Sequence, residues 1–256
     1  MANIALLADI GITNPNNTSA TLQFLLRWIH FLAGITWIGL LYFFNLVNAT
    51  FLKSLAPDIR VKIFPGLMER AMLWFRWSAF VTVLAGFTYW SYFIVMPDAH
   101  NARLHGIDAT AKPTVLWFVL IWTIAFLIEM AVLMAPMEAL QRGPVLATIV
   151  AIAVIAAAYV WLSLDSHAWE SSRLQSIGIG GGIGWFMLFN VWGIIWRIQK
   201  KLIRWNKESA ANATPIPPEA TKLAGQAALV SRINFVLSFP MLLFMAAASH
   251  YPFIVE

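Results

Sequence analysis

A chain of 256 residues that is 60% hydrophobic and only 11% charged is not an ordinary soluble domain, because such domains carry roughly 25% charged residues. The mean hydropathy of +0.72 and the thirteen tryptophans, a residue type that collects at membrane–water interfaces, indicate an integral membrane protein in contact with lipid. The net charge of +5 is explained by membrane topology, so we expect no binding to nucleic acid.

Six stretches are apolar over the roughly 20 residues that a helix needs to cross the hydrocarbon core. They are too long for barrel strands and lack period-2 alternation. We therefore expect an all-α, polytopic transmembrane helix bundle, with residues 1–21 as an outer N-terminal segment and residues 22–256 as a single transmembrane helical domain. The expected spans cover residues 22–47, 71–96, 113–135, 144–164, 177–198 and 227–249.

Two connections between the expected spans have a distinctive composition. Lys53–Arg70 mixes charges with apolar residues at a spacing of four, which predicts an amphipathic helix at the membrane surface. Asn206–Gln226 contains three prolines among Ser, Thr, Ala and Asn residues, which predicts a flexible, extended loop.

The basic residues predict the orientation of the bundle, because loops on the cytoplasmic side carry an excess of Lys and Arg. If the N-terminus is outside, only Arg27, Arg103, Lys112 and Arg173 remain on the outer side. Six spans then place the C-terminus outside as well, and we expect a bacterial inner (cytoplasmic) membrane. The other thirteen of the seventeen basic residues fall on the inner side: Lys53, Arg60, Lys62, Arg70, Arg76, Arg142, Arg197, Lys200, Lys201, Arg204, Lys207, Lys222 and Arg232.

All five histidines fall on the outer side in this topology. Only His30 lies within a span, about 12 Å along the helix axis from Leu22. Ionisable residues inside the membrane are rare and mark functional sites. The remaining histidines follow a span or lie in an outer loop: His100, His105, His167 and His250.

The location of all five histidines on the outer side predicts a haem or metal site in the outer half of the bundle. Imidazole is an axial ligand of b-type haem and also binds copper and zinc. We predict His30 as one ligand and His250 or His167 as the other, with Met241 and Met245 as weaker axial candidates. The alternative is that His30 only forms a hydrogen bond between helices. His100 and His105 are expected to be ordinary solvated side chains.

Glycines in two spans indicate close approach of the backbone to a neighbour. Gly34 lies one helical turn after His30, where the missing side chain leaves space for a flat macrocycle or for another helix. The fifth span begins with five glycines within Gly178–Gly184 and lacks the Lys-Ser/Thr pair of a phosphate loop. We interpret this run as a packing surface for a helix or a cofactor.

Charged residues near the inner ends of three spans predict an ion pair. Glu129 lies in the third expected span, Arg76 in the second and Arg232 in the sixth. Because an unpaired charge in the membrane is costly, we expect Glu129 to pair with Arg76 or Arg232.

The chain contains no cysteine, which excludes disulfides, thiolate metal sites and the C-x-x-C-H attachment of a covalent c-type haem. Any haem must therefore be held by other ligands.

Three stretches resemble the membrane domain of the cytochrome-linked urate hydroxylases, the urate oxidase N-terminal family. They read WIHFLAGITWIGLLYFFN from Trp28, FPGLMERAMLWFRW from Phe64, and SRINFVLSFPMLLFM from Ser231, continuing to His250. The resemblance implies a helical membrane domain that takes part in oxidation chemistry and passes electrons to a cytochrome c. It carries over only His30 and His250, which lie in the matching stretches.

Family members of this type carry the cytochrome as a C-terminal extension, for which this sequence has no cysteines. We therefore expect an electron-transfer subunit that works with a separate cytochrome c or with a larger membrane protein complex. The alternative is a cofactor-free accessory subunit of a respiratory or photosynthetic complex. The sequence does not decide whether the chain is itself an enzyme.

Overall fold

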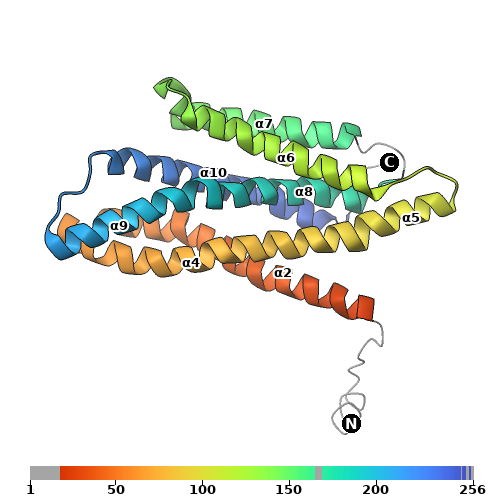
Figure 1. Cartoon of the computed structure of the whole chain (residues 1–256), viewed down its shortest axis with the longest axis horizontal. Coiled ribbons are helices and arrows are strands. Elements are labelled where there is room, and N and C mark those ends of the chain that lie inside the picture. The colour runs from red at the N-terminus through yellow and green to blue at the C-terminus, as the bar shows by residue number, and fades with distance from the viewer. Residues whose placement is uncertain (1–17, 165–168, 249, 252–253, 255–256) are drawn as a thin grey trace, which may run out of the picture.

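In the computed structural model, which describes residues 18–164, 169–248, 250–251 and 254, six helices are long and apolar enough to cross a membrane (Figure 1). No strand occurs in these ranges, so the expected all-α bundle is confirmed. Each expected span overlaps one of the six helices; the third span, 113–135, and the sixth, 227–249, run slightly past the helix ends. Their bounds are Thr18–Ser54, Pro57–Leu104, Ala111–Met134, Gly143–Leu164, Ser172–Asn212 and Glu219–Ala247.

The first, second and fifth of these helices each contain one π-helical turn. They comprise α2 (Thr18–Tyr42) with α3 (Ala49–Ser54), α4 (Pro57–Trp90) with α5 (Met96–Leu104), and α8 (Ser172–Phe189) with α9 (Trp196–Asn212). The π turns cover Phe43–Asn48, Ser91–Val95 and Asn190–Ile195. The other three helices are α6 (Ala111–Met134), α7 (Gly143–Leu164) and α10 (Glu219–Ala247), and a short 3₁₀ turn, Glu138–Gln141, precedes α7.

Local chemistry fixes several helix ends. Pro57 occupies the first turn of α4, where a missing N–H costs nothing. The Ser171 hydroxyl accepts a hydrogen bond from the Leu174 N–H at 3.1 Å and so caps α8. Ala213, with φ of 54°, ends α9 in the left-handed conformation.

Helix α8 lies in the middle of the bundle, against α4, α6 and α10, whereas α7 packs on α6 and α2 packs on α4 (Figure 1). The glycine run makes this position possible. A Cβ at Gly178 would lie 2.3 Å from the Trp161 ring of α7, and one at Gly180 would lie 3.1 Å from the backbone of Met241 in α10. The interpretation of the run as a packing surface is therefore confirmed.

Two connections differ from expectation because helices extend beyond the apolar segments. The stretch expected as a surface helix at Lys53–Arg70 is instead mostly the first part of α4. The loop expected at Asn206–Gln226 narrows to residues 213–218, because α9 continues to Asn212. Charge pairs accompany that extension, with Arg204 3.8 Å from Glu208 and Lys207 2.7 Å from Glu69 of α4.

Candidate functional site

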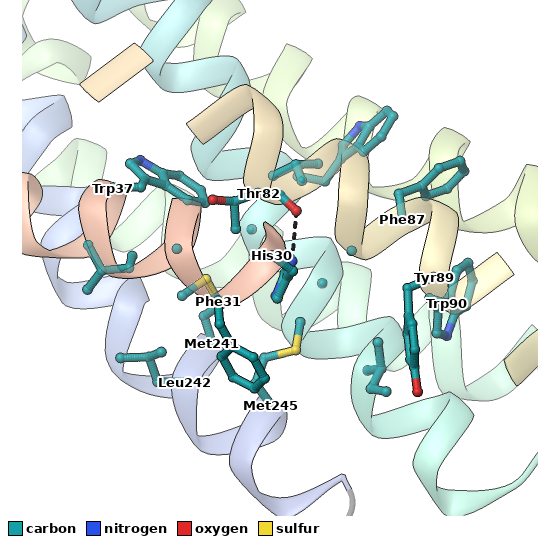
Figure 2. Close-up of a pocket in the computed structure, with 18 of the residues that line it drawn as sticks. His30, Phe31, Trp37, Thr82, Phe87, Tyr89, Trp90, Met241, Leu242 and Met245 are labelled. Carbon is teal, nitrogen blue, oxygen red and sulfur yellow. Dashed lines mark hydrogen bonds between the residues drawn. The ribbon is translucent and has the colours of Figure 1, made fainter. Parts of the chain in front are cut away.

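The His30 ring in α2 is held by one hydrogen bond to the backbone of α4. Its Nδ1 lies 2.8 Å from the carbonyl oxygen of Thr82 (Figure 2). A carbonyl oxygen only accepts, so Nδ1 carries the proton and donates it. Nε2 is then the nitrogen with the free lone pair, and the described residues offer it no hydrogen-bond donor. This is the arrangement of a metal-ligating histidine, in which a backbone carbonyl fixes the tautomer and orients the ring.

Gly86 makes room for this ring. It follows Thr82 by one helical turn, so both face α2. A Cβ at Gly86 would lie 2.6 Å from His30 Cε1 and 2.7 Å from Nδ1. Any other residue at this position would push the imidazole away from the Thr82 carbonyl.

His30 lines a cavity of about 420 Å³, within the range of small-molecule and cofactor sites. The walls come from α2, α4, α6, α8 and α10 and are mostly apolar. From α10, Met241 and Met245 direct their thioethers toward the cavity (Figure 2). Five of the lining residues are glycines, which leave flat backbone surfaces on three helices: Gly34, Gly39, Gly86, Gly181 and Gly184.

The end of the cavity nearest the starts of α2 and α8 is cationic. Arg173 donates a hydrogen bond to the Tyr89 hydroxyl at 2.9 Å, and the Arg27 guanidinium lies 6.0 Å from the centre of the Tyr89 ring. Neither arginine forms an ion pair with a carboxylate of the described residues, and the buried Nε of Arg173 has no hydrogen-bond acceptor among them. Within the described residues, two positive charges therefore have no carboxylate partner and could pair with an anionic group.

The structure separates the sequence-predicted site residues. His30 and Gly34 line the cavity together. His250 is exposed and is not among the lining residues, whereas His167 lies outside the described residues. His100 in α5 and His105 just after it are exposed, as expected of solvated side chains. No group of three or more His, Asp or Glu side chains able to hold a metal ion occurs in the described part of the chain.

The expected ion pair of Glu129 does not form among the described residues, and this expectation is corrected. The Arg76 guanidinium instead lies 3.8 Å from the centre of the Trp196 ring, a cation–π contact. Arg232 is exposed on α10. Glu129 is buried, with a relative exposure of 1%, and the Asn190 side chain is its polar neighbour.

Sequence reasoning missed the partners of His30. Thr82 acts through its backbone carbonyl and Gly86 through the absence of a side chain, so neither carries a chemical signature. Their spacing of four residues on one helix face is the one available signal. Nothing in the sequence distinguishes Arg173 and Tyr89 from other polar residues near the ends of the spans. Their role becomes visible only through the hydrogen bond between them in the structure.

Comparison with protein families gives a match over residues 58–256 to the family described as urate oxidase N-terminal. The match covers α4 to α10 and includes the resembling stretches that begin at Phe64 and Ser231. It starts after α2, so the stretch that contains His30 precedes it. Comparisons with curated proteins and with solved structures gave no match.

Proposed function

The chain belongs to the urate oxidase N-terminal family, and we propose that it is a membrane-embedded electron-transfer subunit that holds a b-type haem in the cavity beside His30. The observation that carries the proposal is the free Nε2 of His30, which faces an apolar, glycine-walled cavity while Nδ1 is fixed on the Thr82 carbonyl. When bound there, a b-type haem would supply one-electron redox chemistry.

The residues of the cavity fit such a group. His30 would hold the haem iron through an imidazole nitrogen, and Met241 or Met245 could add a thioether sulfur as a further ligand. His250, the second ligand expected from the sequence, is outside the cavity, so the methionines are the better candidates. Gly34 and Gly181 present backbone in place of side chains, which suits a flat macrocycle.

The cationic end of the cavity suits the carboxylates that b-type haem carries. Arg27 and Arg173 would neutralise them, and Tyr89 positions the Arg173 guanidinium through its hydroxyl. The buried ring of Trp37 lines the other end, and the buried ring of Trp90 lies beside Tyr89 at the cationic end, so both reduce the access of water. Such exclusion lowers the local dielectric constant and so strengthens the charge pairing.

We further propose that the cationic end faces the outer side of a bacterial inner membrane. The bundle end with the start of α4, the end of α9 and the start of α10 carries most of the Lys and Arg residues, which favours it as the cytoplasmic end (Figure 1). The cationic residues of the cavity lie toward the opposite end, because Tyr89 is at the end of α4 and Arg173 is at the start of α8. A separate cytochrome c, or a larger membrane complex, would then exchange electrons with the subunit on the outer side.

Titration with haemin tests this function directly. We expect the purified chain to give a Soret band that saturates at about one haem per chain, because His30 is the histidine that lines this cavity among the described residues. The dimethyl ester of haemin should bind roughly 10-fold more weakly, since it cannot pair with Arg27 and Arg173. A titration without saturation, or equal binding of acid and ester, would contradict the proposed site.

Gly86→Ala tests the hydrogen bond that orients His30. The new Cβ would force the imidazole from the Thr82 carbonyl, and loss of such an orienting partner lowers ligand affinity by about 10–100-fold. Haem affinity, measured by the same titration, should fall by that factor. Gly66→Ala in the same helix is the matched control, because its Cβ would lie 3.7 Å from Arg70 and outside the cavity. Equal haem affinities of Gly86→Ala and Gly66→Ala would contradict the orienting role assigned to the Thr82 carbonyl.

A further inference from the structure

Glu129 is a buried carboxyl group that the haem proposal does not use. It lies on α6 with a relative exposure of 1%, and neither of its oxygens has a hydrogen-bond donor among the described residues. Asn190, the first residue of the π turn after α8, lies within hydrogen-bonding reach of it. Asn190 is itself fully buried, and its Oδ1 also lacks a donor. Buried oxygen atoms without a hydrogen-bond donor therefore occur on both residues.

The orientation of the Asn190 amide follows from a chain of hydrogen bonds that ends on a backbone carbonyl. The Met187 carbonyl oxygen can only accept, so the Asn234 atom 3.0 Å from it is Nδ2. The other Asn234 atom is then Oδ1, which accepts from Asn190 Nδ2 at 2.9 Å. Asn190 is left with Oδ1 and with the second N–H of Nδ2, since only one of the two amide hydrogens is used on Asn234. The amide cannot flip without placing two oxygens against each other at Asn234.

Asn190 Oδ1 can only accept and has no donor among the described residues, and a protonated Glu129 carboxyl group is able to supply one. We propose that Glu129 is a proton-binding site within the membrane, in which the protonated carboxyl group donates its O–H to Asn190 Oδ1. One bound proton pairs Asn190 Oδ1 with one Glu129 oxygen and removes the buried negative charge.

The surroundings of Glu129 favour a proton over a counter-ion from the chain. Arg76 of α4 is stacked on the Trp196 ring. Arg232 of α10 is exposed, and no described Lys, Arg or His forms an ion pair with Glu129. A carboxylate buried without a partner is strongly unfavourable, and neutralisation by a proton removes that cost.

This site is separate from the cavity beside His30. Glu129, Asn190 and Asn234 are absent from the cavity walls. Glu129 follows Phe118, the cavity residue of α6, by eleven positions, or about 16 Å along the helix axis. Asn190 begins a π turn, a feature that is frequent at functional sites. The assignment holds whether or not haem binds beside His30.

Infrared spectroscopy of the whole protein in nanodiscs tests the proton directly. At a pH where exposed carboxyl groups are ionised, wild type should show the C=O stretching band of a carboxylic acid, which shifts in D₂O. Glu129→Gln should lose this band and keep the fold, because the Gln amide N–H can donate to Asn190 Oδ1 in place of the acid. Glu69→Gln is the matched control. Glu69 is exposed and pairs with Lys207, so only carboxylate bands should change.

Labelling of the Glu carboxyl carbon with ¹³C in wild type gives a second test that needs no variant. The acid band should shift with the label, and the proposal is supported when this shift accompanies its loss in Glu129→Gln. Loss of a carboxylate band in Glu129→Gln, or the absence of a labelled acid band, overturns the proposal. A Glu129 carboxylate band that changes when NaCl replaces choline chloride also overturns it, in favour of a bound sodium ion.

Discussion

Replacing His30 with alanine is expected to abolish haem binding. Among the described residues, His30 is the one histidine that lines the cavity, so no other imidazole there can replace its Nε2. Loss of an orienting partner alone costs about 10–100-fold in ligand affinity, so loss of the ligand itself should cost more than about 100-fold. The measurement is the haemin titration described above, on protein that elutes as wild type does in gel filtration.

His250→Ala is the control for this result. The His250 side chain is exposed beyond α10 and is absent from the cavity walls, so this variant should titrate as wild type does. The opposite result would be loss of haem binding in His250→Ala and retention of haem binding in His30→Ala. That result would favour His250 as the ligand and overturn the site built around His30.

Gly182→Ala is expected to give the largest loss of stability among the glycine substitutions considered. The new Cβ would lie 1.8 Å from Cε2 of Trp122, a fully buried ring of α6. Overpacking of a core costs typically 1–3 kcal/mol, and this contact has no flexible atom that can give way, so we expect about 3 kcal/mol or more. Thermal unfolding in detergent measures the difference.

Two comparisons isolate the cause of that loss. Gly225→Ala in α10 should be neutral or stabilising by up to about 1 kcal/mol, because its Cβ meets nothing within 4 Å and alanine is the better helix former. Adding Trp122→Leu to Gly182→Ala should recover part of the lost stability, because the smaller side chain removes the clash. A Gly182→Ala protein as stable as wild type would show that α8 and α6 are not packed as described.

The fold followed from the sequence because the lipid phase imposes one strong requirement, about 20 apolar residues per helix. What the sequence did not reveal is where those helices end. Helix α9 continues past the apolar segment, where charged residues such as Arg204 and Glu208 pair one turn apart. From composition alone, such a charged stretch looks the same as a solvated loop.

Half of the candidate site was predictable from residue type. His30 was predictable because ionisable side chains inside a span are rare and mark functional sites. Gly34 was predictable because it lies one turn later on the same helix face. Thr82 contributes a backbone oxygen that any residue possesses, so composition could not identify it. The expected ion pair of Glu129 with Arg76 does not form among the described residues. The Arg76 guanidinium is instead stacked on the Trp196 ring, a contact that the sequence did not indicate.

The difference spectrum of the protein purified from its own membrane, dithionite-reduced minus oxidised, tests the assignment of a haem to this cavity most directly. We predict a Soret band and an α band of b-type haem in wild type, both absent from His30→Ala. A wild-type spectrum without these bands would contradict the redox role and support the alternative of a cofactor-free accessory subunit.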